Sequence, residues 1–223
     1  MKIGREIGAD QPPFVIAEMS ANHLGSIARA HAIVDAAADA GCDAIKLQTF
    51  TPASMTLDAA AGDFHIADGP WQGRSLWDLY DEAHTPWQWH AELFAHGQAR
   101  GMVVFSTPFD EESIDRLDAL DAPAFKIASF ELIDLELIAH AARTGKPLIM
   151  STGMASDAEV AEAIETARSS GNGGVALMHC ISGYPAPIEQ TNLRRLDALA
   201  RLVEVVGISD HSPGAIVPIA AVA

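Results

Sequence analysis

The sequence predicts an α/β fold, specifically a (β/α)8 TIM barrel that is incomplete because seven of its eight strands are present. Seven short apolar runs begin near residues 15, 44, 103, 125, 148, 175 and 205, and they alternate with helical patterns. Polar side chains cluster where these runs end, as expected of a barrel whose chemistry lies at one mouth. No glycine-rich dinucleotide fingerprint follows the first run, which disfavours an open doubly wound sheet.

Length and composition fit a single barrel domain that spans residues 1–223. Hydrophobic residues make up 49% of the sequence, which is enough for a substantial core. The net charge of −16 argues against nucleic acid and against an anionic membrane surface as partners. The first ten residues lack the apolar core of a signal peptide, and the last apolar run is too short to cross a bilayer, so we expect a cytoplasmic protein.

Caps and stop signals support the predicted helices. Ser26 begins the first helix and Gly41 follows its end, while Ser156 and Glu159 form a capping box for a later helix that Gly171 ends. A seventh helix follows the last strand. The expected elements are a hairpin at 1–10, strands at 14–20, 43–49, 102–108, 124–129, 147–152, 175–182 and 205–211, and helices at 26–40, 110–120, 134–143, 157–170 and 192–202.

An insertion follows the second strand, from residue 51 to residue 84. The 19 residues from Trp71 to Trp89 contain all four tryptophans and Tyr80. These aromatic side chains suit a lid that faces a sugar at the mouth of the barrel. Packing of the loop against its own helix is the alternative, and it explains the composition at least as well.

Lys126 stands inside an apolar run, AFKIASFE, that has the length of a buried strand. Burying an ammonium group without a partner costs several kcal/mol, so we expect Lys126 to point at an anion. Lys46, on the same side of its strand as Gln48, is another of only four lysines. We predict that both lysines face the barrel lumen and share one dianion, with the hydroxyls of Ser129, Ser151 and Thr107 as donors. The alternatives for each lysine are a snorkelling side chain and a buried ion pair.

Asp210 and His211 close the seventh strand, where they predict a metal ligand or a catalytic base. An imidazole beside oxygen ligands suits Mn, Fe, Zn or a related divalent ion. Glu18 can serve as a base, can orient a polar substrate group, or can form a salt bridge at the rim. His23 and His179 are weaker candidates, and His179 also fits a packed, hydrogen-bonded core residue.

The two cysteines, Cys42 and Cys180, lie far apart in the sequence. Both fall in predicted buried segments, and neither has the spacing of a metal-binding motif. We therefore expect two reduced thiols in the core.

Seven motifs follow one another along the chain, namely VIAEMSANH, DAIKLQTFTPASMTLD, FSTPFD, FKIASFE, STGMA, HCISGYPAP and VGISDHS. In this order and spacing they resemble the sialic acid synthase family, and in particular its pseudaminic acid synthase branch. The resemblance covers essentially the whole chain, and FKIASFE with TPASMTLD favours the pseudaminate branch over the neuraminate one.

The resemblance implies a transferase that condenses phosphoenolpyruvate (PEP) with an open-chain acetamido sugar. For the pseudaminate branch the sugar is 2,4-diacetamido-2,4,6-trideoxy-L-altrose, and the products are pseudaminic acid and phosphate. The resemblance also implies a divalent metal ion, such as Mn, Mg or Co, and a homodimer of the full-length protein. N-acetylneuraminate or legionaminate synthesis is the alternative within the family.

Matching positions carry the family's roles over to this sequence. His211 matches a metal ligand and Glu18 matches a catalytic carboxylate, to which our interpretation of the residues adds Asp210. The positions matching sugar contacts are Gln48, Glu131 and Tyr184, and those matching PEP contacts are Lys46, Thr107, Lys126, Ser129, Ser151, Ser182 and Ser209.

The sequence departs from the family pattern in two places. Ile181 stands where the family usually has threonine, and the chain ends before the expected eighth strand, its second metal-binding histidine and an antifreeze-like domain. We therefore expect residues 1–223 alone to leave open sheet edges that self-associate. A metal-dependent barrel aldolase or isomerase that does not use PEP, and a non-catalytic barrel fragment, are the alternatives to the condensing enzyme.

Overall fold

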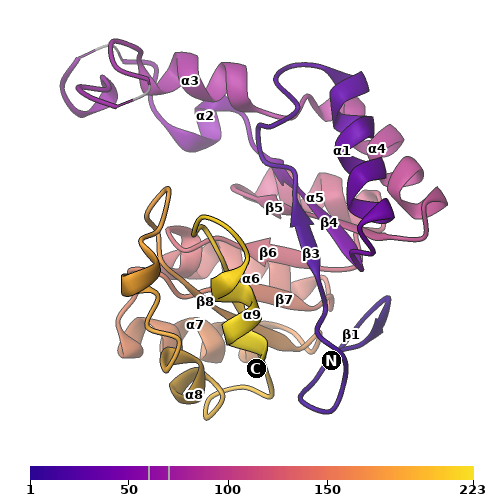
Figure 1. Ribbon diagram of the computed structural model, residues 1–223. Helices are drawn as coiled ribbons and strands as arrows, with labels where there is room; N and C mark the ends of the chain where they lie inside the picture. Colours follow the sequence, from indigo (N-terminus) through magenta and orange to yellow (C-terminus); the bar gives the residue numbers. More distant parts are fainter. Residues whose placement is uncertain (60, 70) are drawn as a thin grey trace. The chain divides into compact units, whose positions relative to one another are not determined.

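The computed structural model describes residues 1–59, 61–69 and 71–223. The chain forms two compact units, each with parallel strands and helices of its own (Figure 1). Unit 1 comprises Met1–Phe14 and Pro123–Ala223, and unit 2 comprises Val15–Ala122. Residues 60 and 70, which fall in the predicted insertion, lie outside the described residues.

Unit 2 is built on three parallel strands, which neighbour one another in chain order. They are β3 (Ile16–Glu18), β4 (Ala44–Thr49) and β5 (Val103–Pro108). The register aligns Glu18 with Lys46 and Gln48 with Thr107, so the polar residues predicted at the strand ends lie in adjacent rows.

The first predicted strand, over residues 14–20, is present but is shorter and less buried than expected. β3 has three residues, and none of them is fully buried. The physical reason is that β3 is the edge strand and pairs with β4 alone. Cys42 also differs from the prediction, because it lies half-buried in the turn before β4 and not in the core.

Three of the five helices described in unit 2, the first, fourth and fifth, pack against β4 or β5. Ser26 caps α1 as predicted, accepting a hydrogen bond from the Arg29 amide at 3.3 Å. On α4, a Cβ atom at Gly97 would lie 2.4 Å from Val104 Cγ2, so glycine is what allows this helix to approach β5. The helices are α1 (Ile27–Asp39), α2 (Pro52–Met55), α3 (Leu76–Ala83), α4 (Trp87–Ala99) and α5 (Glu111–Ala119), with a 3-10 turn at Gly62–Phe64.

The aromatic residues of the insertion mostly pack within unit 2, which favours the alternative to a lid. Tyr80 meets Phe50 edge-to-face with ring centroids 5.9 Å apart, and Trp89 meets the buried His23 in the same way at 5.4 Å. The Arg116 guanidinium lies over the Trp87 ring at 5.3 Å. Trp71, by contrast, is half exposed.

Unit 1 contains the predicted N-terminal hairpin and four parallel strands in chain order. The hairpin pairs β1 (Lys2–Ile3) with β2 (Arg5–Glu6), which confirms that prediction. The register brings Ser151 opposite Met178 and Cys180 opposite Ser209. The parallel strands are β6 (Phe125–Ile127), β7 (Leu148–Ser151), β8 (Val175–Cys180) and β9 (Val205–Ser209).

The helices of unit 1 confirm the predicted caps, but one helix differs from its predicted length. Ser156 and Glu159 form the expected capping box, and Gly171 is the C-cap residue of that helix. The helix predicted at 192–202 is wrong in extent, because Asn192 adopts a left-handed φ of 41° and ordered helix begins only at Arg195. The helices are α6 (Leu135–Arg143), α7 (Asp157–Ser170), α8 (Arg195–Leu199) and α9 (Ile216–Val222), with 3-10 turns at Glu131–Ile133 and Ile188–Gln190.

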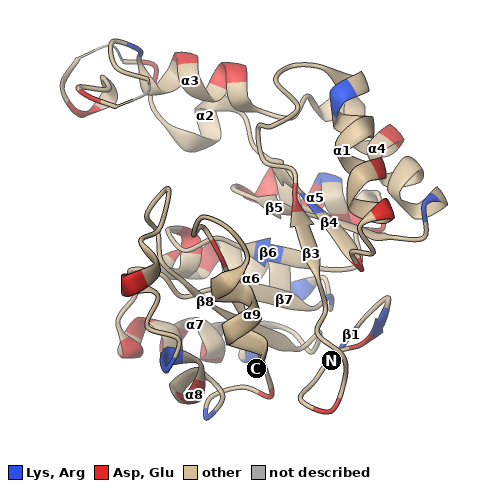
Figure 2. Cartoon of the chain, in the orientation of Figure 1, with Lys and Arg blue, Asp and Glu red and all other residues tan. Residues whose placement is uncertain are grey.

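The acidic excess lies largely on helices, whereas a lysine occupies the short strand β6. Figure 2 shows acidic positions on α3, and the single blue position of β6 is Lys126.

Within the part of the chain that the structure describes, no helix combines the length and the apolar character needed to cross a bilayer.

Candidate functional site

Each unit brings predicted site residues together at the carboxyl ends of its parallel strands. In unit 2 these residues are Glu18, Lys46, Gln48 and Thr107. In unit 1 they are Lys126, Ser129, Glu131, Ser151, Ser182, Tyr184, Ser209, Asp210 and His211. Because Lys46 and Lys126 belong to different units, their sharing of one anion stays a prediction.

Lys46 reaches toward the carboxyl ends of the unit 2 strands. It lies opposite Phe105 in the register, yet its Nζ donates a hydrogen bond to Thr107 Oγ1, two residues farther along β5, at 2.8 Å. The same ammonium forms an ion pair with Glu18. The contact with Glu18 is the rim salt bridge weighed as the alternative for Glu18, and anion binding by Lys46 and Thr107 stays a prediction.

The ion pair between Lys46 and Glu18 is accessible to a ligand. The Glu18 side chain is 40% exposed and that of Lys46 is 13% exposed, so an incoming anion can compete for the ammonium. The second carboxylate oxygen of Glu18 accepts a hydrogen bond from the Ser20 amide at 3.0 Å. Ser20 has a left-handed φ of 48°, which is uncommon for a residue other than glycine and is often found at functional sites.

A buried polar chain stands beside these residues on β4 and β5. His90 Nδ1 lies 3.3 Å from the Pro86 carbonyl, which can only accept, so Nδ1 carries the proton and Nε2 accepts from the Thr49 hydroxyl at 2.8 Å. The Thr49 oxygen in turn accepts from the Ser106 hydroxyl at 2.6 Å. Thr49 immediately follows Gln48, and Ser106 immediately precedes Thr107. This chain of hydrogen bonds therefore fixes the ends of the two strands that carry these site residues.

Burial, aided by the charge of Arg116, lowers the pKa of His90 to about 4 from a usual 6.5. The unfolded chain therefore binds more protons than the folded one between these two values, and the protein loses stability as the pH falls through that range. We expect the lowered pKa of His90 to reduce the free energy of unfolding by about 2 kcal/mol when the pH falls from 7 to 5. Urea unfolding of the wild type and of His90→Gln at both pH values measures this.

His65 provides the matched control for that measurement, because it is an exposed histidine of the same unit. The variant His65→Gln should keep the pH dependence of the wild type, whereas His90→Gln should flatten it. An unchanged pH dependence in His90→Gln would contradict the assignment of a neutral, buried imidazole.

Lys126 is the buried cation of unit 1, with only 5% of its surface exposed. Its Nζ donates to Ser151 Oγ at 2.5 Å and to the Ile127 carbonyl oxygen at 2.9 Å. The charge of Lys126 also acts on the Glu131 carboxyl, so the ammonium has an acidic neighbour as well as these neutral oxygens. Binding of an anion by Lys126 and Ser151 stays a prediction.

Two of the predicted site residues, Ser129 and Glu131, each have a buried side-chain oxygen, Oγ and Oε2, that has no hydrogen-bond partner among the described residues. Leaving such an atom unpaired typically costs about 1–3 kcal/mol, so each is a place where a ligand or water can bind. Burial also raises the pKa of the Glu131 carboxyl, although the charge of Lys126 opposes this. Only the protonated form of a carboxyl group can donate a hydrogen bond, and a raised pKa favours that form.

His211 is oriented as a metal ligand would be. Its Nδ1 lies 3.0 Å from the Ile181 carbonyl oxygen and must donate to it, which leaves the Nε2 lone pair free. His211 thus fits the role of one ligand, although the described residues contain no cluster of three histidine, cysteine or acidic groups around it. The contact with Cys180, together with the Ile181 carbonyl, raises the pKa of His211 against the opposing effect of burial, and the charge of Asp210 adds to this rise. Asp210 itself accepts a hydrogen bond from the Ser212 amide at 3.0 Å.

Cys180 belongs to the same cluster, which the sequence reasoning missed by treating it as an ordinary core thiol. Its Sγ lies 3.8 Å from His211 Nδ1 and 3.9 Å from Ser182 Oγ. Burial acts to raise the pKa of the Cys180 thiol, but the contacts with His211 and its surroundings outweigh it and lower that pKa. The motif HCIS at a strand end was the signal that could have placed this cysteine near the site.

The remaining candidates differ in how closely they are held. Tyr184 is 72% exposed and its ring lies 4.2 Å from that of His211, so it suits contact with a bound molecule. Ser209 ends β9 opposite Cys180. His179 is buried and binds the Thr191 carbonyl at 2.6 Å, which confirms the packed core residue, and the buried His23 accepts from the Gly25 amide at 3.1 Å.

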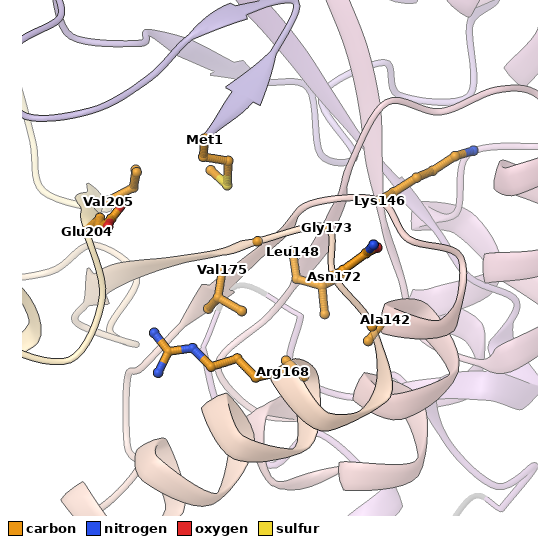
Figure 3. A pocket seen from close by; sticks show the side chains of 13 residues that line it. Met1, Ala142, Lys146, Leu148, Arg168, Asn172, Gly173, Val175, Glu204 and Val205 are labelled. Carbon is orange, nitrogen blue, oxygen red and sulfur yellow. The ribbon is translucent and has the colours of Figure 1, made fainter.

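A cavity of about 320 Å³ lies at the other end of the unit 1 strands. Figure 3 shows Met1, Val175 and Val205 around it, with Arg168 extending from α7. Leu148, Val175 and Val205 are the first residues of β7, β8 and β9, so the cavity lies at their amino ends. It is therefore separate from the residues that gather at the carboxyl ends.

The fold and the site together define an α/β protein of the TIM-barrel type with lysines, hydroxyls and a histidine at its strand ends. The NeuB family profile matches residues 33–223, and the chain therefore belongs to the NeuB family. This confirms the predicted family.

Known relatives agree with this assignment. A pseudaminic acid synthase of Helicobacter pylori is 42% identical over 212 residues, which are 95% of this chain and 62% of that protein. A pseudaminic acid synthase of Campylobacter jejuni is 42% identical over 100% of this chain and 65% of its own length. This chain thus spans less than two thirds of either relative.

A solved structure confirms the predicted fold class. The N-acetylneuraminic acid (sialic acid) synthetase of Leptospira borgpetersenii, in complex with citrate, is 28% identical and matches with a TM-score of 0.87. The match covers 99% of this chain and 73% of that one.

Proposed function

We propose that the protein carrying this chain is a PEP-dependent synthase that condenses PEP with an open-chain acetamido sugar. The observation that carries the proposal is the buried Lys126 ammonium, which donates to Ser151 and to the Ile127 carbonyl oxygen in a member of the NeuB family. The same unit holds the buried Ser129 hydroxyl, which has no hydrogen-bond partner among the described residues. A buried ammonium group can hold a phosphate or carboxylate ligand through charge-assisted hydrogen bonds.

In this reaction the methylene carbon (C3) of PEP forms a carbon–carbon bond to the sugar aldehyde carbon, and the aldehyde oxygen gains a proton and becomes a hydroxyl. Water adds to C2, the carbon that carries the phosphate, and cleavage of the bond between C2 and the phosphate oxygen releases phosphate and leaves a 2-keto acid. Lys126, Ser129, Ser151, Ser182 and Ser209 are the proposed unit 1 contacts to PEP. Their role is to hold the anion and to balance its charge while phosphate departs.

Unit 2 is proposed to supply Lys46 and Thr107 as further PEP contacts and Glu18 as a carboxylate that moves a proton. Gln48, together with Glu131 and Tyr184 of unit 1, is proposed to contact the sugar. The raised pKa of Glu131 suits a donor to a sugar oxygen, and the exposed Tyr184 ring suits contact with an acetamido group.

His211, with Asp210 beside it, is the proposed metal-binding position. A divalent ion bound there, for example Mn, Mg or Co, would polarise the sugar aldehyde. A homodimer and a cytoplasmic location stay predictions.

The proposed sugar is 2,4-diacetamido-2,4,6-trideoxy-L-altrose, and the proposed product is pseudaminic acid. Support comes from the two pseudaminic acid synthases that are 42% identical to this chain. A relative from Campylobacter jejuni named N,N'-diacetyllegionaminic acid synthase is 32% identical, which makes a legionaminate-type product the second candidate.

Phosphate release from PEP tests the proposal when each sugar is supplied in turn to the protein that contains this chain. We expect release to require a sugar, to be fastest with the altrose derivative, and to match the 2-keto acid formed. Faster turnover with another acetamido sugar would reassign the substrate. No sugar-dependent release from an intact, folded protein would overturn the proposed activity.

A further inference from the structure

Gly153 lies buried in the turn after β7, among three groups that converge on the space where a side chain would begin. An ideal Cβ at this position would lie 2.6 Å from Ser182 Oγ, 2.8 Å from Ser129 Oγ and 3.0 Å from the Cys180 carbonyl oxygen. The hydroxyls come from the loops after β8 and β6, and both lie within 2.8 Å of this one point. The absence of a side chain is thus what lets the two hydroxyls come together.

The state of the Ser129 hydroxyl indicates that this arrangement can bind a ligand. Ser129 is only 9% exposed, and its Oγ has no hydrogen-bond partner among the described residues. A buried hydroxyl in that state favours the arrival of an acceptor. The next residue, Met154, holds a left-handed φ of 68°, so the turn keeps an unusual backbone conformation beside these hydroxyls.

We propose that Gly153 is a positioning residue, which keeps the Ser129 and Ser182 hydroxyls close enough to donate to the same anionic group of PEP. The inference rests on the proposed function. It adds a residue, Gly153, that has no side chain with which to bind PEP. A methyl group at position 153 would occupy the point on which the two hydroxyls converge. Each hydroxyl would then turn away, and the anion would lose one or both donors.

The variant Gly153→Ala should therefore bind PEP about ten- to a hundredfold more weakly than the wild type, since hydrogen bonds to a charged group are lost. Titration calorimetry with PEP alone, without sugar, measures this in the protein that contains this chain. Gly183→Ala is the matched control, because a Cβ there meets nothing closer than 3.8 Å in the loop after β8. It should bind PEP as the wild type does.

A background without the two hydroxyls separates positioning from general damage to the turn. In Ser129→Ala/Ser182→Ala the two nearest contacts are absent and only the Cys180 carbonyl oxygen at 3.0 Å remains, so adding Gly153→Ala should lower PEP affinity no further. Equal losses from Gly153→Ala in both backgrounds would overturn the inference, because the effect would not act through the hydroxyls.

The outcomes distinguish the inference from the function on which it rests. PEP binding by the wild type together with undiminished binding by Gly153→Ala would overturn the role of Gly153 and leave the proposed function standing. Weakening by Gly183→Ala as large as that by Gly153→Ala would also overturn it. Failure of the wild type to bind PEP would overturn both.

Discussion

Replacing Lys126 by methionine is expected to weaken PEP binding about 10- to 100-fold in the protein that contains this chain. Methionine keeps most of the length of the side chain but removes the buried ammonium that donates to Ser151 and to the Ile127 carbonyl. The loss corresponds to about 1.5–3 kcal/mol, the usual contribution of a hydrogen bond that involves a charged group. Calorimetric titration with PEP measures it directly.

Lys146→Met is the matched control for this variant. Lys146 lies in the same unit, just before β7, and lines the cavity at the amino ends of the strands. It should bind PEP with wild-type affinity. Equal affinity of Lys126→Met and the wild type, with both proteins folded, would show that Lys126 is a structural cation.

Lys46→Met extends the same test to unit 2. Loss of the Lys46 ammonium also leaves Glu18 without this ion-pair partner. The variant should therefore lose PEP affinity, and a second substitution, at Glu18, should change that affinity again. If the two lysines bind one anion, the combined variant Lys46→Met/Lys126→Met will depart from additivity. Strict additivity would contradict the predicted sharing.

Local patterns explain why most of the fold could be predicted from the sequence. The capping box at Ser156 and Glu159 and the stop at Gly41 are signals read within a few residues, and the structure has both. The failures at β3 and α8 have another origin. Burial of β3 depends on how many neighbours the strand has, and the start of α8 depends on the left-handed turn at Asn192.

The site could be predicted in its members but not in its contacts. Lys126 stood out because a charged residue inside an apolar run needs a reason. That Lys46 pairs with Glu18, and that Cys180 approaches His211, depends on strand register and on loops far apart in the sequence. Gly153 has no side chain to draw notice, and only the closeness of the two serine hydroxyls reveals it.

Removal of divalent metal, or of the His211 imidazole, is expected to lower turnover at least about a hundredfold, since polarisation of a carbonyl by a metal contributes several kcal/mol to the transition state. The hydrogen bond from Nδ1 to the Ile181 carbonyl leaves Nε2 available to a metal, and this is the geometric basis of the expectation.

Phosphate release in excess chelator, and again after metal is restored, measures the first effect, and His211→Ala measures the second. PEP binding should survive both treatments, because the proposed anion contacts are lysines and hydroxyls. His65→Ala, at an exposed histidine, should keep full turnover. Sustained turnover in chelator would remove the metal from the proposal, and sustained turnover in His211→Ala would make this histidine a structural residue that holds the loop after β8 through Ile181.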